Sequence, residues 1–450
     1  MNVGTARAKA AEPMNPRVTS IRTQAEASLA EQFAERDARA PATAEFAALR
    51  AASFESFRES GLPSRRVEAW HYTDLRGALR EALPLFYPEA GALGASDRPT
   101  LARPGAIRLV LTDGVFRPDL SERAEGLNVR SLAEALAQGG ADLVEALVPP
   151  GLARDSMVAL NAAFMDRGVM IEVAAGAQIE RPVELVWISE DPRPQAIFAR
   201  SLLRLGEGSR LTLVESTGQA SAARQINAAL FVSLAENARL DYVRTAAAQP
   251  SSLRIESFAA TLKRGAQLNA SSLVADSPFL RRQTYVRFDG ENAKASLAGL
   301  SLLRGSEHAD NTLLIEHIAP HCESREKFKH IVEGEATGVF QGKIVVAPGA
   351  QKTDGVMASR AILLSPDASM YNKPELEIFA DDVVCGHGAT CGELDEDLLF
   401  YAMARGLPRP DAEALLLEAF AEEALQSIED EVLRETLSER MRAWLAQRGM

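Results

Sequence analysis

The residues best suited to chemistry lie in one glycine-rich stretch near the C-terminus, Cys385-Gly386-His387-Gly388-Ala389-Thr390-Cys391. A deprotonated thiol and an imidazole are both iron ligands, and glycines let the backbone come close to a ligand. In an extended segment, residues two apart share a face, so Cys385 and His387 point the same way. The spacing therefore indicates a metal or cluster ligand pair, with a tight turn and an incidental cysteine as the alternative.

Histidine forms a second group. The chain has six histidines, and four of them lie between His308 and His330. His317, His321 and His330, with Cys322, carry side chains that suit zinc or iron. Pro320 excludes a helix here, so the spacing of His317 and His321 does not give the zinc-protease geometry. These residues are consistent with either a metal site or ordinary positions in strands.

The cysteine count limits what the chain can hold alone. Cys322, Cys385 and Cys391 are its three cysteines, which is no disulfide framework and fits a reducing cytoplasm. A permanent iron–sulfur cluster usually takes four protein ligands. We therefore expect no cluster bound tightly to this chain by itself.

Several function classes are disfavoured. The chain has no phosphate-binding loop, nucleophile elbow, dinucleotide fingerprint or Cys-x-x-Cys pair, so we expect no catalytic residues of its own. The net charge of −13 disfavours binding to nucleic acid. No apolar run is long enough for a membrane span, and residues 1–20 lack the apolar core of a secretory signal. We expect a cytoplasmic protein.

The sequence pattern predicts many short strands in the middle of the chain. Runs such as 170–173, 183–187 and 210–214 alternate apolar and polar residues. A three-residue pattern precedes many of these runs: Gly or Asn, then Ala or Ser, then a polar residue. It begins at Gly176, Gly208, Asn237, Gly265 and Asn292, so successive copies are 32, 29, 28 and 27 residues apart. Gly and Asn tolerate positive φ, so each can turn the chain. The period predicts a mainly β fold, a right-handed parallel β-helix, with a jelly-roll sandwich as the alternative.

Helical patterns flank this middle. We expect a flexible N-terminus over 1–20, a mainly helical domain over 21–105, a β-helix over 106–390 with a helical insertion near 131–147, and a helical domain over 391–450. The terminal helices would cap the open ends of the β-helix. Between residues 393 and 435, 13 acids and 3 arginines give a charge of −10, which suits either a solvated face or a docking surface for a basic partner.

Several longer stretches resemble the SufB/SufD family of iron–sulfur cluster assembly scaffolds. The N-terminal segments Gly61-Leu62-Pro63 and 68–75 are similar to the SufD branch in particular. The remaining matches are Pro320-His321-Cys322, Phe328-Lys329, 349–355, 373–383, Cys385-Gly386-His387-Gly388-Ala389-Thr390 and 400–406. The resemblance covers most of the chain.

The resemblance implies a β-helix flanked by helices and a non-catalytic scaffold role. It implies pairing with the paralogue SufB through the β-helix edge, and docking of the ATPase SufC near Phe400, Tyr401, Arg405 and Gly406. A transient cluster would form at the SufB interface, with His387 as a ligand and Cys385 as a less certain one. Reduced flavin has been linked to the family's complex, and similar edges allow a homodimer when the chain is alone.

Two other classes compete with this reading. A β-helical enzyme acting on polysaccharide would need a carboxylate cluster on one face. A cupin-like metalloenzyme would use His317, His321 and His330 and bind one metal tightly. Cys391 has no assigned role in any of these readings.

Overall fold

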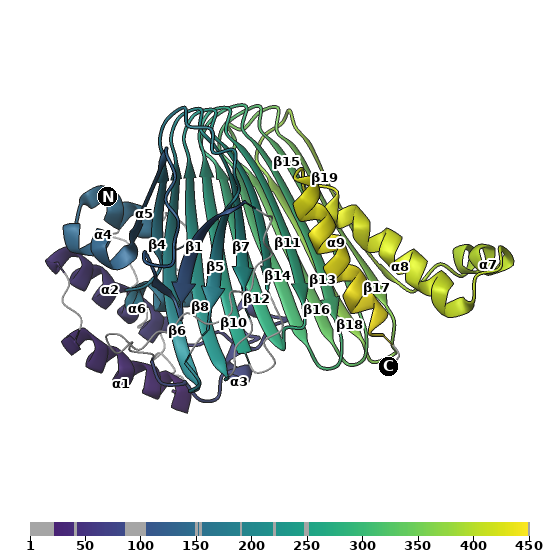
Figure 1. Cartoon of the computed structure of the whole chain (residues 1–450), viewed down its shortest axis with the longest axis horizontal. Coiled ribbons are helices and arrows are strands. Elements are labelled where there is room, and N and C mark those ends of the chain that lie inside the picture. The colour runs from purple at the N-terminus through teal and green to yellow at the C-terminus, as the bar shows by residue number, and fades with distance from the viewer. Residues whose placement is uncertain are drawn as a thin grey trace, which may run out of the picture.

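The computed structural model describes residues 22–39, 43–85, 105–148, 152, 155–189, 191–218, 222–246 and 252–448. In these ranges the chain winds into a β-solenoid with helices at both ends of the sequence (Figure 1). The expected flexible segment 1–20 lies outside the described residues. The mainly β solenoid is confirmed, whereas the expected domain boundaries stay predictions.

Two sheets form the walls of the solenoid, and from residue 169 onward successive strands alternate between them. One sheet has ten strands in the order β19-β17-β15-β13-β11-β9-β7-β5-β1-β2. Every pairing in it is parallel except that of β1 with β2. Its strands are β1 (Ile107–Thr112), β2 (Val115–Phe116), β5 (Val183–Ile188), β7 (Arg210–Thr217), β9 (Arg239–Ala246), β11 (Gln267–Ala275), β13 (Lys294–Leu303), β15 (Glu323–Val332), β17 (Asp354–Leu363) and β19 (Val384–Gly392).

The other sheet has nine strands in the order β18-β16-β14-β12-β10-β8-β6-β4-β3. They are β3 (Leu127–Ser131), β4 (Val169–Val173), β6 (Gln195–Leu205), β8 (Arg224–Leu234), β10 (Ser252–Leu262), β12 (Phe279–Phe288), β14 (His308–His317), β16 (Thr337–Val346) and β18 (Ser369–Ile378). Because each turn of chain supplies one strand to each sheet, the repeat inferred from the glycine and asparagine spacing is the turn of the solenoid.

One corner of each turn uses a residue with positive φ. All five residues of the sequence pattern adopt it, from Gly176 at 72° to Asn292 at 60°. The series continues with His321 at 58° and Lys352 at 62°. The N–H of each corner residue donates to a carbonyl of the next turn, as Asn237 does to Arg264 at 2.8 Å and His321 to Gln351 at 2.9 Å. His321 is therefore a corner residue.

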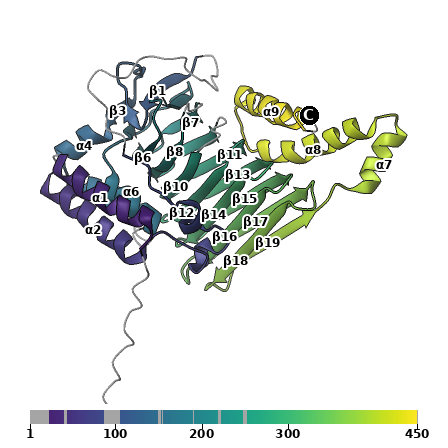
Figure 2. The ribbon, with the colours of Figure 1, turned by 90° about the horizontal axis from the view of Figure 1, so that it is seen from below.

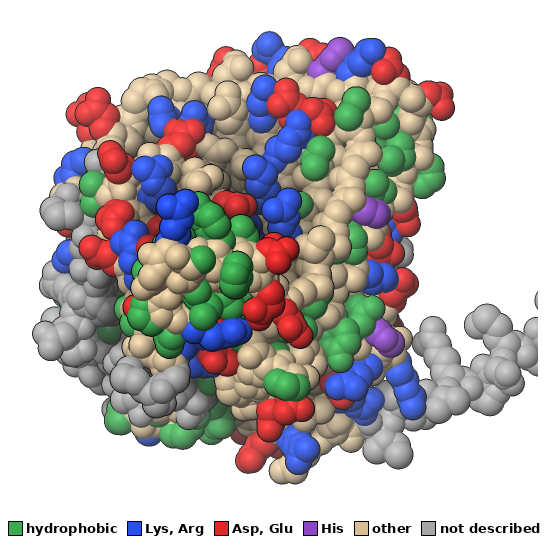
Figure 3. Space-filling model, turned by 90° about the vertical axis from the view of Figure 1, so that its right-hand side faces the viewer, with side chains coloured by type: hydrophobic (Ala, Val, Ile, Leu, Met, Phe, Trp, Pro, Cys, Tyr) green, Lys and Arg blue, Asp and Glu red, His purple; other side chains and the backbone are tan. Residues whose placement is uncertain are grey.

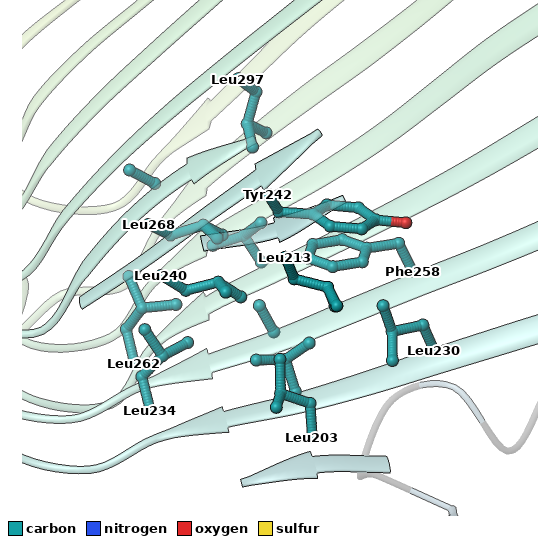
Figure 4. Close-up of a cluster of buried hydrophobic side chains, with 14 of the residues drawn as sticks. Leu203, Leu213, Leu230, Leu234, Leu240, Tyr242, Phe258, Leu262, Leu268 and Leu297 are labelled. Atoms are coloured by element: carbon teal, nitrogen blue, oxygen red, sulfur yellow. The ribbon is translucent and has the colours of Figure 1, made fainter. Parts of the chain in front are cut away.

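The inside of the solenoid is packed with stacked apolar side chains. Leu203, Leu213, Leu230 and Leu240 belong to one buried cluster that runs between the sheets (Figure 4). Tyr242 and Phe258 stack there with ring centroids 5.0 Å apart. Alternate residues of each strand face this interior, so the strands can bury one face and lay the other against helices.

The N-terminal helices cover the outer face of the nine-stranded sheet. The covering elements are α1 (Gln24–Arg39), α2 (Ala44–Ser60), the 3₁₀ turn η1 (Glu68–Trp70), α3 (Leu75–Ala78) and α6 (Ser156–Phe164). Two short helices, α4 (Leu132–Gln138) and α5 (Ala141–Leu147), lie in the region of the helical insertion, and Ser131 with Glu134 forms a capping box at the start of α4. Trp70 of η1 packs against the guanidinium of Arg281 on β12, which lies 3.8 Å from the ring centroid.

The C-terminal helices are α7 (Glu396–Ala404), α8 (Arg409–Leu425) and α9 (Glu431–Ala446). Leu417, Leu437 and Trp444 share an apolar cluster with Val243 and Leu300 of the ten-stranded sheet. The expectation that these helices cap the end of the solenoid is wrong, because α8 and α9 lie along the outer face of the sheet (Figure 2). Among the described residues, no further strand follows β18 or β19, so this end of the solenoid is open.

Candidate functional site at the open end of the solenoid

Strand β19 carries the glycine-rich motif and forms the last strand of its sheet. It pairs in parallel with β17, placing Cys385 beside Gly355 and His387 beside Met357. Within the described part of the chain, neither β19 nor β18 has a strand on its other side. The motif is therefore displayed on a free sheet edge.

Cys385 lies at the boundary between the interior and the open end. Its side chain is half-buried and packs against the interior apolar cluster. A Cβ added to Gly355 would lie 3.6 Å from the Cys385 sulfur, so the thiol sits over a position that has no side chain. Burial raises the pKa of the Cys385 thiol, which favours the protonated form until a metal displaces the proton.

His387 is exposed and shares the inward-facing side of β19 with Cys385. Cys391 falls on the same side, four residues farther along the strand, and is also exposed. The structure thus places the two expected ligands on one face of a free edge, together with a thiol for which the sequence indicated no role. A second chain could reach all three side chains.

The other histidines do not converge. The ring of His317 stacks on Phe288 at 4.3 Å, and its Nε2 lies 3.2 Å from the hydroxyl of Ser324. His330 is fully buried, and His321 occupies a corner. Among the described residues, no group of three or more His, Cys, Asp or Glu side chains could hold a metal ion. The cupin-like histidine site therefore finds no support in this geometry.

Helix α7 holds the residues that the family resemblance links to partner docking. Phe400 is 74% exposed and Tyr401 59% exposed, although both are large and apolar. The guanidinium of Arg405 lies 5.1 Å from the Tyr401 ring centroid and donates to its hydroxyl at 2.9 Å. Gly406, at φ 96°, turns the chain from α7 toward α8.

A view of this end of the molecule shows hydrophobic side chains interspersed with acidic ones (Figure 3). Helix α7 contacts α8 through Leu399, Ala402 and Ala412 and projects away from the sheets (Figure 1). Its outer face therefore has no partner among the described residues. A patch of this kind marks an interaction surface more often than a solvated one.

The acidic bias of 393–435 has a partly internal explanation. Glu429 forms ion pairs with Arg239 and Arg210, and Glu423 pairs with Lys329 at 2.6 Å. These acids attach α8 and the α8–α9 connection to basic residues on the ten-stranded sheet. The charge therefore serves contacts within the chain as well as any partner.

Sequence reasoning missed a carboxyl inside the solenoid. Glu326 faces inward on β15, and neither of its oxygens has a hydrogen-bond partner. Burial raises its pKa to about 8. The one sequence feature that predicts an inward-facing Glu326 is its place in the alternation of the strand, two residues from both Ser324 and Phe328.

Comparison with known proteins agrees with the fold and the motif. The family model described as the SufBD core domain of the SUF system for FeS cluster assembly matches residues 187–420. The iron-sulfur cluster assembly protein SufD of Escherichia coli K12 is 31% identical over 387 residues, covering 85% of this chain and 89% of that protein. A SufBD family protein of Synechocystis is 28% identical, covering 82% and 84%, and SufD of Bacillus subtilis is 26% identical, covering 59% and 61%.

The fold and these matches define a β-solenoid protein of iron–sulfur cluster assembly. The chain belongs to the SufB/SufD family. Within that family, the Escherichia coli and Bacillus subtilis matches support the SufD branch. No helix in the described ranges is long and apolar enough to cross a membrane.

Proposed function

We propose that this chain is a non-catalytic scaffold subunit of a SUF complex, in which it pairs with SufB and binds the ATPase SufC. The nascent cluster is the cargo, held for a short time at the interface with His387 as one ligand and Cys385 as a second. The observation that carries the proposal is that both side chains lie on β19, the free edge of a sheet.

Hydrogen bonding supports pairing through this edge. The N–H of Val384 donates to the carbonyl of Thr353 at 2.8 Å. In a parallel ladder, alternate residues bond to the same neighbour, so the N–H groups of Cys385, His387 and Ala389 point toward the free side. A paralogous strand could continue the sheet there and bring its own ligands beside His387.

Apolar exposure at the same end supports a large partner. Val384 is 69% exposed and Phe379 62% exposed, and Tyr371 on β18 is also exposed. An open edge with apolar side chains invites association, and natural proteins usually cover such an edge. The same feature allows a homodimer when SufB is missing.

The ligand set supports transient rather than permanent binding. This chain offers few thiols, and a neutral imidazole binds iron less tightly than a thiolate does. A cluster shared between two chains can then leave for its acceptor. Reduced flavin stays an expectation for the complex, with no residues of this chain assigned to it.

The ATPase contact is proposed at α7. Phe400 and Tyr401 are exposed there, and α7 stands clear of the sheets, so a partner could reach it without meeting the solenoid (Figure 2). The ATPase activity would belong to SufC. Because α7 joins α8 and α8 packs on the ten-stranded sheet, a movement of the partner would be transmitted to the solenoid.

Anaerobic co-expression with SufB and SufC tests the proposal. The complex is purified through a tag on this chain, and its native mass is measured. We expect one SufB, two SufC and one copy of this chain. Recovery of this chain alone at every salt concentration would contradict the scaffold role.

A further inference from the structure

A small cavity lies inside the solenoid, away from the open end. Its volume is about 40 Å³. Tyr242, Phe258 and Leu297 of the stacked interior contribute to its wall (Figure 4). Arg244 and Arg282 line it as well, although both arginines are buried.

These arginines belong to a buried charge network. Arg282 donates from Nε and Nη2 to Oε2 of Glu256, at 3.1 and 2.9 Å. Arg254 donates from Nε to Oε1 of the same carboxylate at 3.1 Å. Arg244 lies 2.9 Å from Glu256 and 3.3 Å from Glu215.

The network holds more positive than negative charge. Three arginines, Arg244, Arg254 and Arg282, face two carboxylates, Glu215 and Glu256, which leaves a formal charge of +1. Burial alone would raise the pKa of Glu256, but the three guanidinium groups outweigh it and hold that pKa well below the usual range. Glu256 is therefore ionised in the folded chain.

The remaining polar group of the network does not cancel this charge. The Tyr242 hydroxyl donates to Glu215 at 2.6 Å, and burial raises the pKa of Tyr242 well above 10. Tyr242 is therefore neutral. A buried net charge without a counter-ion destabilises the folded state.

One nitrogen on a cavity-lining side chain has neither a hydrogen bond nor an ion pair among the described residues. The Nη1 of Arg282 is buried and has no hydrogen-bond partner among the described residues. Thr284 and Ser272 line the cavity beside it and add hydroxyl groups. A positively charged cavity with an unpaired guanidinium N–H and nearby hydroxyls is the chemistry that binds an anion.

We propose that this cavity binds one small monovalent anion of halide size, which completes the Arg244–Glu256–Arg282 network. The volume of 40 Å³ has room for one chloride or bromide ion, and the single excess positive charge of the network matches a monovalent anion. The site is separate from the cluster ligands, because β9, β10 and β12 supply its arginines whereas β19 supplies Cys385 and His387. If the cavity held only water, the excess positive charge of the network would have no counter-ion.

Crystals grown with bromide as the sole halide test the site directly. Diffraction at the bromine absorption edge is expected to show one anomalous peak between Arg244 and Arg282. The thermal unfolding midpoint should also rise by about 2–4 °C with 100 mM chloride or bromide, beyond the effect of sulfate at equal ionic strength.

Two variants and a control make the test specific. Arg282→Met removes the free donor and the excess charge, so the peak and the halide-specific stabilisation should both vanish. Ala270→Val fills the cavity while keeping every charge, and it should lose the peak even if Arg282→Met does not fold. Arg287→Gln removes a surface arginine of the same strand and should keep both effects. Water density without an anomalous peak in the unmodified protein, or equal halide stabilisation in Arg282→Met, would overturn the proposal.

Discussion

His387 is the register partner of Met357, so an exposed imidazole lies on the strand directly next to a buried thioether at the rim of the solenoid. The imidazole is exposed because no further strand follows β19 in the described sheet. Met357 belongs to the interior apolar cluster, and His387 is not a member of that cluster. Ligand function and packing are therefore separable at this position.

His387→Ala should abolish cluster maturation in cells and leave the complex assembled. The activity of an iron–sulfur enzyme that depends on this pathway measures the first effect, and native mass measures the second. The control is His321→Asn, which changes another exposed histidine but keeps a residue that tolerates positive φ. Unchanged maturation in His387→Ala would remove His387 from the proposed ligand set.

Ala389→Pro should weaken pairing with the paralogue without unfolding the solenoid. Its N–H is directed to the free side of β19, so proline removes a donor that only a partner strand would use. Thr390→Pro is the contrast, because the N–H of Thr390 belongs to the ladder with β17. Thermal unfolding and pull-down separate the two, and equal partner binding by Ala389→Pro and the unmodified chain would argue against strand addition.

Phe400→Asp should reduce binding of the ATPase partner at least about 10-fold, the loss typical of a central aromatic contact. The side chain is exposed, so the free energy of unfolding of this chain should stay nearly unchanged. Val432→Asp on α9 is the matched control, because it places the same charge on another exposed apolar position. Titration calorimetry distinguishes them, and equal affinity for both variants would place the docking surface elsewhere.

Glu326 should make stability depend on pH. Its pKa is about 8 in the folded chain against 4.5 as the ordinary value, so the folded state binds more protons between these pH values. The free energy of unfolding therefore falls as pH rises from about 4.5 to 8, by on the order of 2–5 kcal/mol from this group. Glu326→Gln should match the unmodified chain at pH 5 and exceed it at pH 8.5 in urea denaturation.

Glu323→Gln on the same strand is the control for that measurement. The Glu323 side chain is 45% exposed and pairs with Lys294 at the surface, so its loss should not reproduce the gain in stability at alkaline pH. If Glu326→Gln and the unmodified chain had the same free energy of unfolding at both pH values, the prediction would be wrong. The buried carboxyl would then be stabilised by a contact that the described residues do not include.

His321→Gly should stabilise the chain by about 0.5–1 kcal/mol, because glycine adopts positive φ without the Cβ penalty. Gly265→Ala should act in the opposite direction, since its Cβ would lie 2.3 Å from the Asn237 side-chain oxygen. Chemical denaturation measures both. A loss of stability in His321→Gly would mean that the imidazole contributes more than the backbone strain costs.

Much of the architecture could be predicted from local residue types. Gly and Asn at regular spacing indicated five corners, and all five have positive φ. His321 and Lys352 occupy equivalent corners but lay outside the predicted pattern, because that pattern was defined by Gly and Asn. The glycine-rich motif identified β19 as the candidate site, since it combines metal-binding side chains with an alternating strand.

The repeat, the mainly β solenoid and the residues of the candidate ligand pair could all be recognised in the amino-acid sequence, because they follow from conformational preference and from spacing along one strand. Tertiary structure decided that β19 lies at a free edge and that α8 and α9 cover a sheet face instead of the open end. It also decided the charge network, whose members come from four strands between Glu215 and Arg282. Such features arise when residues far apart in sequence become neighbours, and no local pattern records which turns of the solenoid will stack.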